Sequence, residues 1–223
     1  MRILAVDTSS ERGSVCVVDA GQILGEIRLA SSIQHSDRLF RSIAFLFEYL
    51  PFELQQMDLF AAALGPGSFT GLRVGLAAVE AFAAAQQRPA AGVTTLEALA
   101  WKTGIHDALI APTIDARRGE VYGGLYRRIA DTLVEERPAV VLKPVEWFAS
   151  LPGQRVIFCG DGAVRYRSLI EERPEWGVHP MHLYLASAIA ELVATPNCKP
   201  LKPVYVRKTD AEIARESFAG PNS

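Results

Sequence analysis

Two aspartates at the ends of apolar segments are the residues of this sequence most suited to chemistry. Asp7 follows the apolar residues 3–6, and Asp115 follows a second apolar run over residues 108–114. A carboxylate at a strand end can face a metal ion while the amides and hydroxyls of the next turn face a phosphate. If the two halves form lobes with equivalent strand ends, both carboxylates face one cleft. Either aspartate alone is more simply explained as a residue that forms a turn.

The longest distinctive motif spans residues 65–75, with the sequence GPGSFTGLRVG. An apolar segment of strand length, 58–64, precedes it and an alanine-rich segment, 76–87, follows it, so the pattern predicts a strand, a tight turn and a helix. The motif lacks the Lys and hydroxyl residue of a P-loop and the glycine spacing of a dinucleotide-binding turn. It also lacks the Gly-x-Ser-x-Gly of a nucleophile elbow. These departures favour a structural turn in which Ser68 or Thr70 caps the helix.

Two predicted helices carry more apolar residues than one core-facing side needs. The helix that begins within the motif has glycines at helical spacing, and a glycine inside a soluble helix costs about 1 kcal/mol relative to alanine. Another backbone therefore comes close, either the protein's own sheet or a partner helix. The helix predicted over 36–50 has a second apolar stripe, which we assign to a partner protein. The predicted contact residues are Leu39, Phe40, Ile43, Phe47, Gly71, Val74, Gly75, Ala78 and Phe82.

Other candidate sites are weaker. His179 and His182 flank a proline and have no third ligand nearby, so no metal site is predicted. The cysteines are three in number and form no Cys-x-x-Cys, which favours free thiols in the cytosol. No Ser-His-Asp or Cys-His arrangement is recognisable.

Length and composition are those of an ordinary globular protein, with 223 residues and a formal net charge of −2. A protein that binds nucleic acid by itself usually has a basic face, so we expect another protein to supply most of any affinity for RNA. No apolar run reaches membrane-spanning length and the N-terminus enters a strand rather than a signal peptide, so a cytoplasmic protein is expected. The pattern of the first half repeats after a boundary near residues 105–107, which predicts one lobe over 1–105 and a second over 106–223.

The repeated pattern of strand, aspartate, turn and hairpin resembles the two-lobed actin, acetate kinase and Hsp70 superfamily. Several motifs resemble the TsaB (YeaZ) family more closely. They are residues 3–9 (ILAVDTS), 35–36 (HS), 65–77, 94–100 (TTLEALA), 114–122 (IDARRGEVY), 160–162 (GDG) and 203–207 (PVYVR). The resemblance covers nearly the whole chain. It implies an α/β fold of two actin-like lobes (ASKHA, ribonuclease H-like), each with a mixed five-stranded sheet flanked by helices.

The resemblance also implies a function. Members of this family act with TsaD and the ATPase TsaE to move a threonylcarbamoyl group from threonylcarbamoyl-AMP to the adenosine 3′ of the anticodon, in tRNAs that read codons beginning with A. TsaD carries the catalytic site and a metal held by two histidines, whereas this sequence has no His-x-x-x-His. We therefore expect a non-catalytic scaffold. It would pair with TsaD through its two N-terminal helices, or with a second copy of itself when alone, and meet tRNA only within the complex.

A vestigial nucleotide cleft is a further expectation from the resemblance. Its residues would be Asp7, Thr8, Ser9, Asp115, Gly160 and Gly162. No tightly bound cofactor is expected, and weak binding of ATP or ADP with magnesium within the complex stays open. Two alternative functions also stay open. One is a small phosphotransferase that uses the two aspartates with Mg-ATP, although no Lys or base is recognisable at the cleft. The other is a metalloprotease, which the missing ligands disfavour.

Overall fold

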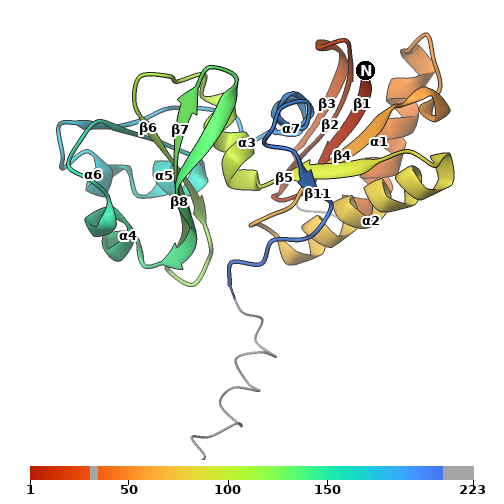
Figure 1. The fold of residues 1–223 in the computed structure, drawn as a ribbon. Coiled ribbons are helices and arrows are strands. Elements are labelled where there is room, and N and C mark those ends of the chain that lie inside the picture. Colours follow the sequence, from red (N-terminus) through yellow and green to blue (C-terminus); the bar gives the residue numbers. More distant parts are fainter. Residues whose placement is uncertain (31–34, 208–223) are drawn as a thin grey trace, which may run out of the picture.

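The two halves of the chain form two mixed β-sheets with matching strand order, which the computed structural model describes over residues 1–30 and 35–207 (Figure 1). One sheet contains the order β3-β2-β1-β4-β5 and the other is β8-β7-β6-β9-β10. In each sheet a three-stranded antiparallel meander is extended by two parallel strands. The strands are β1 (Arg2–Asp7), β2 (Arg12–Asp19), β3 (Gln22–Ala30), β4 (Leu59–Ala63), β5 (Ala90–Val93), β6 (Leu109–Asp115), β7 (Val121–Ile129), β8 (Thr132–Leu142), β9 (Val156–Cys159), β10 (Trp176–Val178) and β11 (Lys199–Pro200). The predicted two-lobed actin-like α/β fold is confirmed.

The helices begin where the sequence supplies a cap. Ser68 accepts a hydrogen bond from the Gly71 amide at 3.3 Å at the start of α2, and Thr94 and Glu97 form a reciprocal capping box at the start of α3. Gly104, with φ of +67°, follows the end of α3. The helices are α1 (His35–Tyr49), a 3₁₀ turn (Leu54–Gln56), α2 (Phe69–Gln86), α3 (Thr95–Lys102), α4 (Pro144–Ser150), α5 (Asp161–Arg165), α6 (Arg167–Ile170) and α7 (Ala186–Leu192).

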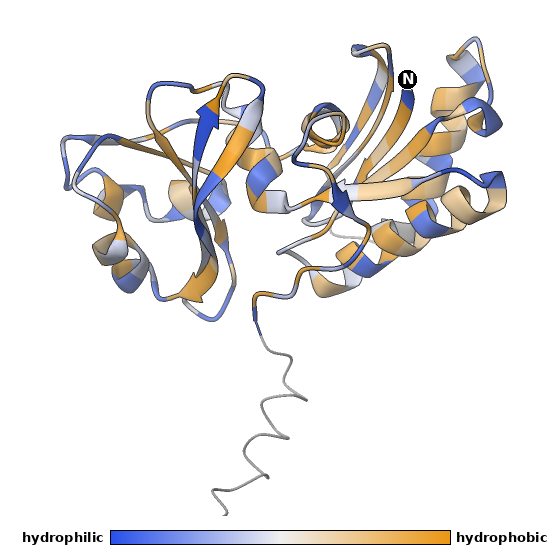
Figure 2. Cartoon of the chain, viewed as in Figure 1, coloured by the Kyte–Doolittle hydropathy of each residue, from blue (hydrophilic) through white to orange (hydrophobic). Residues whose placement is uncertain are grey.

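Helices α3 and α7 lie between the two sheets and are exchanged between the lobes (Figure 1). Helix α3 follows the first sheet in sequence but packs on β6, β7 and β8, whereas α7 comes late in the chain and packs on β1, β2 and β4. In Figure 2, α7 is coloured as hydrophobic over much of its surface, as expected for a helix covered on several sides. Its residues Ala186, Ile189 and Leu192 are fully buried. Helices α1 and α2 cover the outer face of the first sheet.

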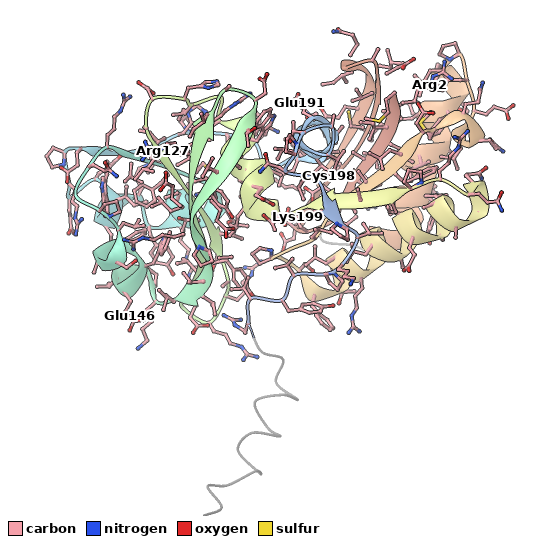
Figure 3. All side chains as sticks on the ribbon, in the orientation of Figure 1. Arg2, Arg127, Glu146, Glu191, Cys198 and Lys199 are labelled. Atoms are coloured by element: carbon pink, nitrogen blue, oxygen red, sulfur yellow. The ribbon has the colours of Figure 1, made fainter. Side chains whose placement is uncertain are left out.

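Strand β11 adds a sixth strand to the first sheet, where five were expected. It pairs antiparallel with β5, and its Lys199, labelled in Figure 3, forms an ion pair with the buried carboxylate of Glu97. The expected division into 1–105 and 106–223 is therefore wrong for α3, α7 and β11. The sequence pattern marks the order of the two sheets along the chain, but burial of apolar helix faces decides which sheet each helix covers. Residues 208–223 of the expected second lobe lie outside the described part of the chain.

In the described residues, no helix is long and apolar enough to cross a membrane.

Candidate functional site

The glycine-rich turn rests directly on the loop that follows β1. The Ser68 amide donates to the carbonyl of Ser9 at 2.7 Å, and Thr8 Oγ1 donates to the carbonyl of Gly71 at 2.7 Å. A Cβ at Gly71 would lie 2.0 Å from the carbonyl oxygen of Thr8, and one at Gly75 would lie 2.3 Å from Thr8 Oγ1. Neither position has room for a side chain. The glycines of α2 therefore allow the helix to approach the protein's own backbone.

Five of the residues predicted to contact a partner are instead buried within the chain. Gly71, Gly75 and Ala78 are buried against the first sheet, and Leu39 and Ile43 are buried in the core beneath α1. The sequence left two explanations for the close approach of another backbone, and the structure assigns it to the protein's own sheet. These five residues are corrected from partner contacts to internal packing, because they are covered within the single chain. A substitution at Gly75 would test this packing and not a partner.

The other four predicted contacts are not fully buried: Phe40 is exposed, and Phe47, Val74 and Phe82 are partly buried on α1 and α2. Phe40 is 49 % exposed and its ring meets that of Phe82 edge-on, with centroids 5.9 Å apart. Helix α2 also exposes a row of alanines beside this pair, which the sequence analysis did not include. The helical spacing of these alanines was readable, but only the buried arc of α2 shows which way they face. We define the α1–α2 face as Phe40, Phe47, Val74, Ala77, Ala81, Phe82, Ala84 and Ala85.

Asp7 lies at the end of β1 but is closed off from the cleft. Its side chain is fully buried, and its Oδ1 accepts hydrogen bonds from the amide and hydroxyl of Ser9 at 2.9 and 2.7 Å. The backbone of Leu185, just before α7, lies near the carboxylate. Burial raises the pKa of Asp7 to about 6, while the hydrogen bonds from Ser9 and the more distant ammonium of Lys102 act in the opposite direction. This aspartate is a buried structural carboxylate.

Asp115, at the equivalent end of β6, lines the cleft and is paired. Its Oδ2 accepts a hydrogen bond from Arg165 Nη1 at 2.6 Å, and its Oδ1 accepts one from the Arg117 amide at 2.9 Å. The Asp115 amide in turn donates to Asp161 Oδ1 at 3.0 Å. The prediction that both carboxylates face one cleft is wrong for Asp7 and confirmed for Asp115.

The cleft between the lobes has a volume of about 930 Å³. The first lobe contributes 9–12 and 66–69, and the second contributes 114–118 and 160–161, together with residues near the C-terminal end of the described chain. Of the six predicted cleft residues, Ser9, Asp115 and Gly160 line it, whereas Asp7, Thr8 and Gly162 do not.

The predicted cleft glycines serve packing rather than a phosphate cradle. A Cβ at Gly160 would lie 2.5 Å from the carbonyl oxygen of Thr113, and one at Gly162 would lie 2.8 Å from the carbonyl carbon of Ile114. The described residues also contain no group of three or more His, Cys, Asp or Glu side chains that could hold a metal ion. With Asp7 enclosed and Asp115 paired with Arg165, the cleft does not fit a magnesium-bound nucleotide held by these two carboxylates. The phosphotransferase alternative loses its two proposed ligands.

Several residues at or near the cleft were not identified as candidates from the sequence. Arg165 pairs with Asp115 from a helix fifty residues further along the chain, and no local pattern indicates such a contact. Phe69 and Tyr205 form a ring pair at the cleft, with centroids 5.7 Å apart. The sequence analysis included both in family motifs without giving either a role.

Comparison with protein families and curated proteins gives a consistent set of relatives. The sequence matches the family model of TsaD, described as tRNA N6-adenosine threonylcarbamoyltransferase, over residues 25–215. A Bacillus subtilis (strain 168) protein named tRNA threonylcarbamoyladenosine biosynthesis protein TsaB is 30% identical over 174 residues, which cover 77% of this chain and 76% of that protein. The Escherichia coli (strain K12) protein of the same name is 35% identical over 149 residues, which cover 65% of this chain and 63% of that protein.

Solved structures give the same answer for the fold. YeaZ from Pseudomonas aeruginosa superposes with a TM-score of 0.77 and 27% identity, covering 92% of this chain and 99% of that one. The ethanolamine utilization protein EutJ from Carboxydothermus hydrogenoformans superposes with a TM-score of 0.51 and 15% identity, covering 86% of this chain and 90% of that one. The second similarity is one of fold alone.

Proposed function

Because this chain belongs to the TsaB (YeaZ) family, within the wider TsaD family, we propose that it is a non-catalytic scaffold subunit in the synthesis of threonylcarbamoyladenosine in tRNA. In this proposal it works in the cytoplasm with TsaD and the ATPase TsaE. The threonylcarbamoyl group passes from threonylcarbamoyl-AMP to the adenosine 3′ of the anticodon, in tRNAs that read codons beginning with A. The chain holds TsaD in a working arrangement and forms a homodimer when alone.

The α1–α2 face is the observation that carries this proposal. It combines the half-exposed ring of Phe40 and the partly buried ring of Phe82 with a row of exposed alanines on α2. Small side chains let a second helix approach closely, and large aromatic side chains contribute strongly to the binding energy of protein interfaces. Exposed apolar side chains grouped on neighbouring helices are typical of a protein interaction site. Helices of TsaD, or of a second copy of this chain, are the proposed occupants.

The non-catalytic role is supported by the chemistry of the described residues. Asp7 is enclosed, Asp115 is paired with Arg165, and no metal-binding cluster accompanies them in this part of the chain. The two histidines that the family resemblance places in TsaD have no His-x-x-x-His counterpart in this sequence. In this proposal TsaD carries out the transfer reaction.

A matched pair of surface variants tests the scaffold. Ala81→Glu places a charge at the centre of the α1–α2 face, and we expect roughly 100-fold weaker binding to TsaD because the carboxylate must be desolvated. Val145→Glu places the same charge on α4, where Val145 is 67 % exposed on the other lobe. Binding is measured by titration of labelled TsaD, with melting temperature as a check on folding. Equal affinity of the two variants would contradict the assignment of this face.

The function itself is tested in cells depleted of the protein. Nucleoside mass spectrometry of bulk tRNA should show loss of threonylcarbamoyladenosine, restored by the wild-type chain and by Asp7→Asn but not by Ala81→Glu. Restoration by wild type and not by a folded Asp7→Asn variant would give this carboxylate an active part. Unchanged modification in depleted cells would refute the proposed pathway.

A further inference from the structure

We propose that the cleft between the lobes binds an unpaired stretch of RNA. Arginines of the cleft bind its phosphates, and its bases stack on the rings of Phe69 and Tyr205. The inference rests on the proposed function, because it gives the scaffold a direct contact with the substrate of the pathway. It differs from a magnesium–nucleotide site, for which the carboxylates of the cleft are unsuited.

The cleft has the size and composition for such a ligand. Its volume of about 930 Å³ is shared between both lobes and the segment 204–207. Four arginines line it, Arg12, Arg117, Arg118 and Arg207, on a chain whose formal net charge is −2. Arginine is the side chain best suited to phosphate, because its planar group donates two parallel hydrogen bonds.

Three carboxylates, those of Glu11, Asp115 and Asp161, line the cleft beside the four arginines, so the lining keeps a formal excess of one positive charge. Asp115 is paired with Arg165. Arg117 approaches Glu11 at 3.4 Å, but the two side chains are 74 % and 68 % exposed, so a phosphate can replace this contact at little cost. Arg207 pairs with Glu120, and its guanidinium lies 5.6 Å from the ring centroid of Tyr122.

The loop that carries two of the arginines is held in an uncommon conformation. Arg117 and Arg118 have φ of +61° and +55°, and Gly119 follows with +75°. Non-glycine residues in the left-handed region are uncommon and cluster at ligand sites. The loop is fixed by the hydrogen bond from the Arg117 amide to Asp115 and by a backbone bond from Ala116 to Glu120 at 3.0 Å. The strained loop therefore presents adjacent arginines at the rim of the cleft.

The aromatic residues select RNA over an acidic peptide. Phe69 is 44 % exposed and Tyr205 is 46 % exposed, although each contacts the other. The guanidinium of Arg73 lies 3.9 Å from the ring centroid of Phe69 on α2. Exposed rings next to arginines are the arrangement on which unpaired bases stack, and each stacked base contributes roughly 1–3 kcal/mol. The carboxylates of an acidic peptide gain nothing from the ring faces, which carry partial negative charge.

The test measures binding of a labelled anticodon stem–loop RNA to the full chain, alone and mixed with TsaD, by fluorescence anisotropy over a range of salt concentrations. We expect Arg117→Gln to weaken binding several-fold and to lower the slope of log affinity against log salt by roughly 0.7. We expect Phe69→Ala to weaken binding about ten-fold with little change in this slope. A hairpin of the same stem closed by a minimal loop should bind less well.

Arg127→Gln is the matched control. Arg127, labelled in Figure 3 on the second lobe, also forms an exposed ion pair, with Glu136 at 2.7 Å, but it does not line the cleft. The inference is overturned if Arg117→Gln and Phe69→Ala bind RNA with the same affinity as Arg127→Gln. It is also overturned if the chain binds RNA neither alone nor mixed with TsaD, or if a polyglutamate peptide competes for binding as well as unlabelled RNA does. Failure of the proposed function is seen separately, because tRNA from depleted cells would then keep its modification whatever the RNA affinity.

Discussion

The two lobes share one strand order, yet the ends of their first strands serve different purposes. In the first lobe Asp7 is enclosed beneath the segment before α7, and the glycines of α2 close over the adjacent Thr8. In the second lobe Asp115 stays at the cleft and is held by an arginine from a short helix. Equivalent positions in a repeated topology therefore carry different chemistry, because the elements that cover them differ.

The outer faces of the two lobes also differ in how completely helices cover their aromatic side chains. The second lobe closes its outer core with Trp147, Phe148, Phe158 and Trp176, all nearly buried under short helices. The first lobe is covered by two long helices that leave Phe40 half-exposed. The second lobe therefore buries its aromatic residues within the chain, whereas the first leaves an aromatic ring at the surface between its two long helices.

The largest expected effect concerns the packing of α2 over the first strand end. Gly71→Ala would force a Cβ to within 2.0 Å of the Thr8 carbonyl oxygen, so we expect a loss of about 3 kcal/mol in unfolding free energy. The melting temperature should fall by roughly 10 °C. Calorimetry of the purified chain measures both quantities.

Gly177→Ala is the control in the second lobe, where the nearest atom to an added Cβ is Ile157 Cδ1 at 3.6 Å. We expect its melting temperature to stay within about 3 °C of the wild type. A Gly71→Ala variant as stable as Gly177→Ala would show that the packing of α2 does not depend on its close approach to Thr8.

A second expected effect is a pH dependence that only the first strand end produces. Burial raises the pKa of Asp7 from 3.8 to about 6, so the folded chain binds this proton more tightly than the unfolded chain. Stability contributed by the protonated carboxyl is therefore present below pH 4 and is lost as pH rises to about 6. Relative to Asp7→Asn, the wild type should lose on the order of 3 kcal/mol of unfolding free energy over this interval.

Urea denaturation at a series of pH values measures this difference, and Asp115→Asn serves as the control that retains Asp7. Parallel pH profiles for wild type and Asp7→Asn would show that water reaches Asp7, and the distinction between the strand ends would fail.

The smallest expected effect is at the second strand end. Arg165→Gln removes the 2.6 Å ion pair with Asp115, but the arginine side chain is 57 % exposed, and solvent screens such pairs strongly. We expect no measurable change in melting temperature at physiological salt. A clear loss of stability would mean that the second strand end, like the first, is fixed for structural reasons.

The strands, the helices and their order could be predicted because they depend on local signals, whereas the two-lobed fold was implied by the resemblance to the actin, acetate kinase and Hsp70 superfamily. Apolar strands, the capping residues Ser68 and Thr94, and the repeated strand–Asp–turn pattern all lie within short windows. The candidate site was predicted less well, because its geometry depends on contacts between distant segments. Whether Gly71 faces a partner or Thr8, and whether Asp7 is covered by Leu185, is set by tertiary packing that no spacing rule reports. The same limit explains why α3 and α7 were assigned to the wrong sheets.

The exchange of α3 and α7 also sets an order of events during protein synthesis. Strands β1 to β5 are complete by Val93, but α7, which covers their inner face, begins only at Ala186. While the ribosome makes the second lobe, residues such as Ala5 and Cys16 on that face lack their final cover. Chains that stop before α7 would keep both meanders and yet expose this surface, which makes them natural targets for chaperones and proteases. The inner face of the first sheet is therefore fully covered only after α7 has been synthesised.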